Sequence, residues 1–540
     1  MRQKTATFDE IVYMMAGYTH LTMRDLRMEP CAPPLTKIIA GIPLLFLNLK
    51  SPAEFEQWHK PADIKYINEF EFAKDFLYRS GQDADKILFF GRISSVLTSL
   101  LLGFWVFHWS RRLYGLNSGY FALFLYVFSP NILAHSRLVT PDIGFTCALI
   151  ITMYYFWRFL CLPSNFNFVI SAVCLGVAQL TKYSALLLFP VFLFLLYFYR
   201  FRICESKEFI LNNIIKNKVL FSLICMAVMG IIAFSVVWAG YGFEYGTVLL
   251  PKEDHDTANQ FFSRYLPEKF VSFIVGAGEK IPVPAPSYFY GMAAIKTPLT
   301  RDTFILGRNF PGSPWYAYIV AFIIKTPIPA LIFIIMALLL FVRKKTLCPK
   351  DERVILAPVI GFAIASAIVH FEIQLKYILP VYPLLFIFVS QVIDQKFMRR
   401  TFYKLIFGVL CLWYLLAALN IFPHYIPYFN EFIGGPKNGY KYLVAANLDW
   451  GQDLKLLRDY LKKNGIEKVK LSYYGTADPD YYDIKYEILK PFEVSSGWIA
   501  VSATHLQGVH TAKEGFSWLK KYKPVTVLGY SIFLYNIDPE

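Results

Sequence analysis

Charge is what this sequence has least of, and its cysteines form no recognisable framework. Only 17% of the 540 residues are Asp, Glu, Lys or Arg, whereas a soluble globular protein carries roughly 25%. Most of the eight cysteines lie in or beside apolar runs, as Cys147, Cys174 and Cys225 do, and none follows Cys411. A disulfide scaffold is therefore excluded for the last part of the chain. The composition also excludes a disordered chain, a collagen and a long coiled coil.

Apolar residues make up 56% of the chain and come in long uninterrupted runs. A membrane-spanning helix needs about 20 such residues. Ten runs are candidate spans, near residues 87–109, 117–134, 142–160, 168–181, 184–200, 219–240, 324–342, 354–371, 377–394 and 404–421. The fourth and fifth are short and meet at Lys182, which leaves open a hairpin or a broken pair. The sequence predicts a mainly α-helical, polytopic membrane bundle over residues 87–423.

Basic residues are distributed unevenly between the two sets of connections. The connections after the odd-numbered runs carry 17 Lys and Arg residues, whereas the short connections on the other face carry only Arg137, Lys182 and Lys376. Basic loops stay in the cytoplasm. The net charge of +15 is therefore first a sign of topology, and we expect a multi-pass protein of the cell membrane.

Three larger segments then lie outside the cytoplasm: residues 1–86, about 241–315, and 424–540. Two stretches of the first segment, 35–47 and 62–79, have the apolar spacing of helices lying in the membrane interface. The less favoured alternative for 35–47 is that it belongs to a protein core. In the last segment, strand patterns (441–446, 467–474, 498–503, 524–528, 531–536) alternate with helical ones (452–463, 512–522). We expect an extracytoplasmic α/β domain there, and its near-neutral charge argues against a nucleic-acid partner.

Acidic residues beside apolar sequence on the outer side are the first candidates for chemistry, because charge near lipid is costly. Asp9 and Glu10 precede the apolar stretch IVYMMAGY, and Asp142 follows Pro141 at the mouth of the third span. Either acid could be a general base. Asp at the start of a helix is also a common N-cap, which is the plainer interpretation of both positions.

Cations and polar residues at the outer helix ends form the second group. Lys182 stands in QLTKYS, and His370, Lys376 and Tyr377 stand in HFEIQLKYILPVYP. Ammonium groups there suit an anionic phosphate. A lone Lys near lipid more often extends toward the interface simply to keep its charge in water.

The motifs together resemble a known group of membrane enzymes. FDEIVYMMAGYTHLTMRDLRMEPCAPPLTK resembles the first outer loop of lipid-carrier-dependent glycosyltransferases of the GT-C membrane fold, which include protein O-mannosyltransferases and aminoarabinose transferases. RLVTPDIGFTCALI, GVAQLTKYSALLLFP and QLKYILPVYPLL resemble later motifs of that group, in the same order. The region FPHYIPYFNEFIGGPKNGYKYLVAANLDWGQDLKLLRDYL resembles the carboxy-terminal part of a bacterial subgroup.

The resemblance implies transfer of a sugar from a polyprenyl phosphate to a lipid or protein acceptor on the extracytoplasmic face. Asp9 would correspond to the catalytic base, with Glu10 beside it and Asp142 in the second acidic loop. Arg92, Arg137, Lys182 and Lys376 are the cations available to hold the departing phosphate. No cofactor is certain, because no His/Asp cluster has metal-ligand spacing, but a divalent cation is left open.

Two features depart from the family pattern. The family has a span before its Asp-Glu loop, whereas this chain starts with MRQKTATFDE, so we expect an in-frame extension of roughly 20–30 codons upstream, enough for one helix. The subgroup also has Asp-Ser-Asn before DWGQ, where this chain has Ala445-Ala446-Asn447. That difference argues against a catalytic role for the stretch.

Two other classes of protein were weighed against an enzyme. A transporter or flippase places ionisable groups near the bilayer midplane on broken helices, often in repeated halves. Here the acids lie at loop edges and no half repeats the other, although the break at Lys182 fits a transporter. A receptor or scaffold anchored by its spans would need far fewer than ten.

Overall fold

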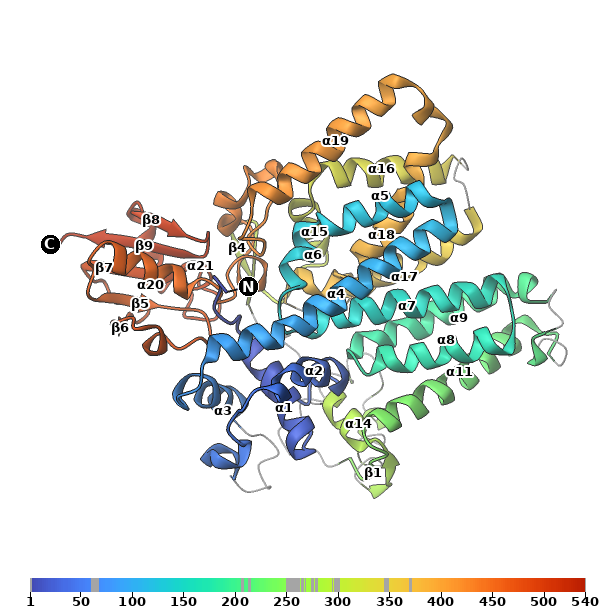
Figure 1. Cartoon of the computed structure of the whole chain (residues 1–540), viewed down its shortest axis with the longest axis horizontal. Helices are drawn as coiled ribbons and strands as arrows, with labels where there is room; N and C mark the ends of the chain where they lie inside the picture. Colours follow the sequence, from blue (N-terminus) through green and yellow to red (C-terminus); the bar gives the residue numbers. More distant parts are fainter. Residues whose placement is uncertain are drawn as a thin grey trace.

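The computed structural model describes residues 2–59, 68–204, 208–211, 215–248, 280–293, 302–343, 349–368 and 372–539, with residues 263, 267, 269–272, 276 and 295 between them. Helices α4 to α11 and α15 to α19 form a bundle, a small sheet lies beyond one end of it, and the N-terminus lies between the two (Figure 1). Among the described helices, five are long and apolar enough to cross a membrane, or six with one bent pair. The protein is a multi-pass membrane protein, as the sequence predicts.

The helices of the bundle follow the predicted apolar runs. Their bounds are α4 Ala84–Tyr114, α5 Leu116–Val127, α6 Pro130–His135, α7 Pro141–Cys161, α8 Asn165–Gln179, α9 Leu188–Cys204, α11 Lys218–Gly240, α15 Ala317–Lys325, α16 Ile328–Val342, α17 Pro349–Ile368, α18 Val381–Val389 and α19 Thr401–Asn420. Each of the ten runs contains a helix, but α5, α8 and α18 are shorter than a span. α15 and α16 meet at an angle of 114°, because Thr326 is extended and Pro327 cannot continue the first helix.

Three short helices pack beneath the bundle and carry the first acidic loop: α1 Glu10–Met23, α2 Pro34–Gly41 and α3 Glu69–Lys74. α1 and α2 touch through glycine. A Cβ at Gly17 would lie 1.9 Å from the carbonyl oxygen of Lys37, so no other residue allows this approach. After α2, the exposed side chains of Leu45 and Phe46 provide the apolar surface that the interfacial prediction for 35–47 requires. Of the predicted stretch 62–79, residues 62–67 lie outside the described part.

A five-stranded mixed sheet forms the carboxy-terminal domain, in the order β6-β5-β7-β9-β8. Its elements are α20 Leu454–Lys463, β5 Val469–Ser472, β6 Tyr486–Ile488, β7 Gly497–Ser502, α21 Ala503–Leu506, β8 Thr526–Leu528 and β9 Ile532–Ile537. β5 pairs in parallel with β6 and β7, and β9 pairs antiparallel with β7 and β8. The predicted α/β domain is therefore confirmed.

Two local predictions for this domain are wrong. The apolar stretch 441–446 is not a strand: it is buried against neighbouring segments, and Ala445 has a positive φ of 52° that breaks extended structure. Residues 512–522 form only a short 3₁₀ turn at Ser517–Lys521 instead of a helix. The remaining described elements are the small hairpin β3 Asp302–Ile305 with β4 Arg308–Pro311, the pair β1 Tyr245–Gly246 with β2 Val283–Pro284, and α14 Pro286–Ala293.

Candidate active site

Asp9 lies immediately before α1 and faces a cavity rather than capping the helix. It occupies the N-cap position but makes no capping hydrogen bond. Its Oδ2 instead accepts a hydrogen bond from Lys376 Nζ at 2.9 Å, and 29% of its side chain is exposed. A carboxylate that is partly accessible and held by an ammonium group is available to react with a bound molecule.

Asp142 and Lys182 form a second pair of the same kind. Asp142 is in the first turn of α7, and its Oδ1 accepts a hydrogen bond from Lys182 Nζ at 2.7 Å. The other oxygen, Oδ2, has no hydrogen-bond partner among the described residues although Asp142 is only 1% exposed. A buried carboxylate oxygen without a partner is costly, which favours a functional role over simple capping.

Both pairs line one cavity of about 160 Å³. Tyr377 joins them, because its ring centre lies 4.8 Å from Lys182 Nζ and 5.6 Å from Lys376 Nζ. The lining residues are Asp9, Val12, Tyr13, Glu29, Phe70, Pro141, Asp142, Lys182, Lys376 and Tyr377. The structure thus brings five of the predicted site residues together, from segments hundreds of residues apart.

The pKa values of several titratable side chains that line the cavity differ from those of the same groups in water. Burial lowers the pKa of Lys376, but Asp9 and its other neighbours more than offset this, so the pKa is raised and the side chain stays an ammonium. Burial outweighs the attraction of Asp142 at Lys182 and lowers the pKa of that group. Burial, with a smaller contribution from nearby Glu69, raises the pKa of Glu29 to about 8. The protonated form of Glu29 is therefore favoured relative to a carboxyl group in water.

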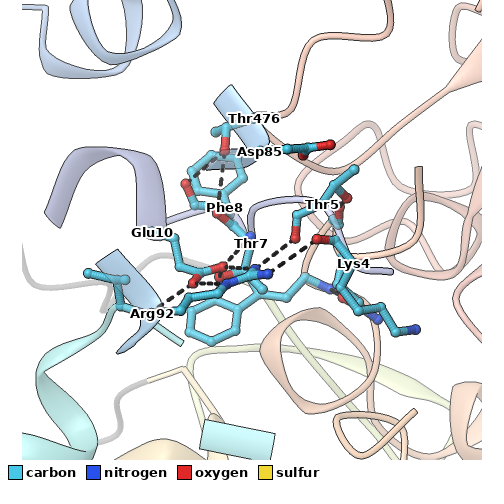
Figure 2. Close-up of polar contacts among 12 residues, drawn as sticks. Lys4, Thr5, Thr7, Phe8, Glu10, Asp85, Arg92 and Thr476 are labelled. Atoms are coloured by element: carbon cyan, nitrogen blue, oxygen red, sulfur yellow. Dashed lines mark hydrogen bonds and ion pairs between the residues drawn. The ribbon is translucent and has the colours of Figure 1, made fainter. Parts of the chain in front are cut away.

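Glu10 points away from the cavity into a buried ion pair with Arg92. Arg92 donates to both Glu10 oxygens, from Nε at 2.9 Å and from Nη2 at 2.6 Å (Figure 2). The same oxygens accept hydrogen bonds from the backbone N–H groups of Thr7 and Val139. Glu10 is 0% exposed and Arg92 2% exposed. This geometry gives no support to the predicted catalytic role of Glu10 or to phosphate binding by Arg92.

The two remaining predicted site residues are not part of the cavity as described. Arg137 donates to the carbonyl oxygen of Pro423 at 2.6 Å and lies over the ring of Tyr425. It lines a separate, much smaller hollow. His370 lies outside the described residues.

Sequence reasoning missed Glu29 and Trp450, which stands beneath Lys376 with its ring centre 4.2 Å from Nζ. Glu29 lies within the first-loop motif, and Trp450 within DWGQ, but neither residue stood out from its neighbours. As for metals, no three His, Cys, Asp or Glu residues in the described ranges lie close enough to hold an ion.

Comparison with protein families agrees with the resemblance noted in the motifs. Residues 81–238 match the family described as dolichyl-phosphate-mannose-protein mannosyltransferase, which confirms the resemblance for the stretch from α4 to α11. No curated protein matches the chain. ArnT from Cupriavidus metallidurans bound to undecaprenyl phosphate is 10% identical, with a TM-score of 0.46 over 100% of this chain and 96% of that one. AglB from Archaeoglobus fulgidus, in complex with an inhibitory peptide and a dolichol-phosphate, is 11% identical, with a TM-score of 0.49 over 96% and 69%.

Proposed function

We propose that the protein is an integral-membrane glycosyltransferase that moves a sugar from a polyprenyl phosphate to a lipid or protein acceptor. The observation that carries the proposal is the pair of Asp–Lys contacts around one cavity, within a chain that matches a dolichyl-phosphate-mannose-dependent family over residues 81–238. A polyprenyl tail must stay in the bilayer, so its phosphate can only react at the ends of membrane helices. Asp142, Lys182 and Lys376 stand at such ends.

The residues of the cavity suit the two needs of the reaction. Asp9 accepts the proton of the acceptor's hydroxyl or amino group as that group attacks the anomeric carbon of the sugar. The bond from the anomeric carbon to the phosphate oxygen breaks, and its electron pair leaves with the polyprenyl phosphate. Lys182 and Lys376 then balance the negative charge of the departing phosphate. The ring of Tyr377 lies within about 6 Å of both ammonium groups and attracts them toward the cavity wall.

A donor assay with the purified chain in liposomes tests this function. The liposomes contain polyprenyl-phosphate sugars labelled in the sugar, together with glycolipid or peptide acceptors, and release of polyprenyl phosphate is measured. We expect Lys376→Met to lower kcat/KM about 10- to 100-fold, because one charge-assisted hydrogen bond contributes about 1.5–3 kcal/mol. Lys463→Met is the matched control, since Lys463 is exposed in the last turn of α20.

Consumption of a nucleotide sugar, or of no polyprenyl-linked sugar at all, would contradict the proposal. Passage of the intact donor across the liposome membrane, without cleavage, would favour a flippase.

The membrane orientation is a further part of the proposal, with the cavity and the carboxy-terminal domain outside the cytoplasm. It rests on the basic connections, of which those after α4, α9, α16 and α18 hold most Lys and Arg residues. In a background without native cysteines, we expect Lys521→Cys, at an exposed position of the domain, to react with an impermeant thiol reagent in intact spheroplasts. Lys404→Cys, near the start of α19, should react only after lysis. The opposite pattern would reverse the orientation.

A further inference from the structure

The chain before Asp9 is held by a short segment of the carboxy-terminal domain. The N–H of Phe8 donates to the carbonyl oxygen of Trp450 at 2.9 Å, and the N–H of Thr5 donates to that of Gln452 at 3.1 Å. Thr5 Oγ1 also donates to the carbonyl oxygen of Gly451 at 2.8 Å. These contacts join residues more than 440 positions apart in the sequence. Through them, residues 450–452 fix the backbone of residues 5–8, which leads to Asp9.

A second contact fixes the peptide group that directly precedes Asp9. Thr476 Oγ1 donates to the carbonyl oxygen of Phe8 at 3.0 Å (Figure 2). The Phe8 ring stacks on Tyr474, with ring centres 5.3 Å apart and planes at 18°. Both partners follow β5, so the sheet itself supports the Asp9 backbone.

The same segment also holds the partner of Asp9. Asn447 Nδ2 donates to the carbonyl oxygen of Ile373 at 2.6 Å, and Asn447 Oδ1 accepts from the N–H of Leu375 at 2.9 Å. These bonds hold the backbone directly before Lys376. The ammonium of Lys376 lies over the ring of Trp450, whose side chain is 1% exposed. A cation over a buried aromatic face is attracted to it.

The backbone of this segment tolerates little change. Gly451 has a φ of +84°, and a Cβ there would lie 2.7 Å from Gly475 Cα. Only glycine fits both conditions. The close contact with Gly475 therefore fixes the backbone conformation between Trp450 and Gln452.

We propose that Trp450 is a positioning residue, and that residues 447–452 set the Asp9–Lys376 pair from both sides. The inference rests on the proposed function, and it gives the carboxy-terminal domain a role in catalysis without contact between Trp450 and the cavity contents. The ring of Trp450 positions the ammonium of Lys376, and its carbonyl oxygen positions the backbone directly before Asp9. Reacting groups displaced by about 1 Å can lose 100-fold in rate.

The test compares Trp450→Phe with Trp450→Leu in the donor assay. Trp450→Leu is expected to lower kcat about 10- to 100-fold while KM for the donor changes by less than about twofold, because the cation loses its aromatic face. Trp450→Phe keeps such a face and is expected to recover most of the rate. The matched control is Trp498→Leu, in β7 of the same domain, which pairs with Asn536 and should leave kcat within about twofold.

Three outcomes would overturn the inference. They are an unchanged kcat in Trp450→Leu, equal losses in the Phe and Leu variants, and a loss explained by the folded fraction seen in thermal unfolding. Should Trp450→Leu fail to fold, Thr476→Val decides, because it removes the hydrogen bonds from Thr476 Oγ1 to the carbonyl oxygens of Phe8 and Thr7, directly before Asp9. We expect kcat to fall about fivefold at constant KM, and no change refutes the inference. Wild-type protein that transfers no sugar would instead refute the proposed function.

Discussion

Replacing Asp9 with Asn is expected to abolish sugar transfer, lowering kcat by about 10²- to 10⁴-fold, the usual contribution of a general base. The amide has the size of the carboxylate but cannot accept the proton of the attacking group. Asp9 is the acid best placed for this task, since it lines the cavity, is 29% exposed and caps no helix. The measurement is the single-turnover rate of transfer from labelled polyprenyl-phosphate sugar in liposomes.

Folding and donor binding serve as the controls for this variant. Asp9→Asn should still fold, because the amide oxygen can accept the hydrogen bond from Lys376, but its unfolding temperature should fall, because the buried ammonium of Lys376 loses its counter-charge. Asp459→Asn, on the exposed face of α20, should transfer at the wild-type rate. Full activity in Asp9→Asn would remove Asp9 from the mechanism and make Asp142, which also lines the cavity, the next candidate for the base.

The bundle could be predicted well from the sequence, because a membrane-spanning helix requires an uninterrupted run of about 20 apolar residues. Five of the ten runs became helices that are long and apolar enough to cross a membrane, since a helix satisfies its own backbone hydrogen bonds in lipid. Runs 117–134 and 377–394 became shorter helices broken at Ser129 and Ser390. Hydropathy measures how long a run of apolar residues is, and it does not detect a break in a helix when the surrounding residues are apolar.

The composition of the site could be predicted only in part. Asp9, Asp142, Lys182, Lys376 and Tyr377 all line the cavity, and each stands at the end of an apolar stretch of the sequence. Their pairing could not be foreseen, since Asp9 and Lys376 are 367 positions apart. Glu10 was grouped with Asp9 as its neighbour. Successive residues at a helix start point about 100° apart, however, so only one of the two can face the cavity.

Besides the break at Lys182, which fits a transporter, the described helices contain a second break, at the bend between α15 and α16. Lys325 ends α15, at the 114° bend, and is 2% exposed. Its ammonium donates to the carbonyl oxygens of Ile426 and Asn447. The cation at the break is thus engaged with the segment that leads into the carboxy-terminal domain, and it lines no part of the Asp9 cavity.

Replacing Glu10 with Gln, which breaks the Glu10–Arg92 pair, is expected to have the second large effect, a loss of stability together with a lower transfer rate. Glu10→Gln leaves the Arg92 charge buried at 2% exposure without its carboxylate. Loss of one partner of a buried pair costs about 3–5 kcal/mol, out of a total of about 5–15 kcal/mol. Since Arg92 also donates to the carbonyl oxygens of Lys4 and Thr5, the chain that leads to Asp9 loosens too. We expect a much lower unfolding temperature in detergent.

The pH dependence of stability and a double variant distinguish a stabilising role of Glu10 from a catalytic one. Burial alone would raise the pKa of Glu10, but Arg92 and the backbone N–H groups hold the pKa below its usual 4.5. The stabilisation is therefore complete at neutral pH, and is lost as the pH falls below about 4.5 toward the pKa in the folded state. Glu10→Gln should flatten that loss, and Glu10→Gln with Arg92→Met should regain stability over the single variant, since no unpaired charge remains. A Glu10→Gln protein as stable as the wild type but inactive would instead restore Glu10 to the chemistry.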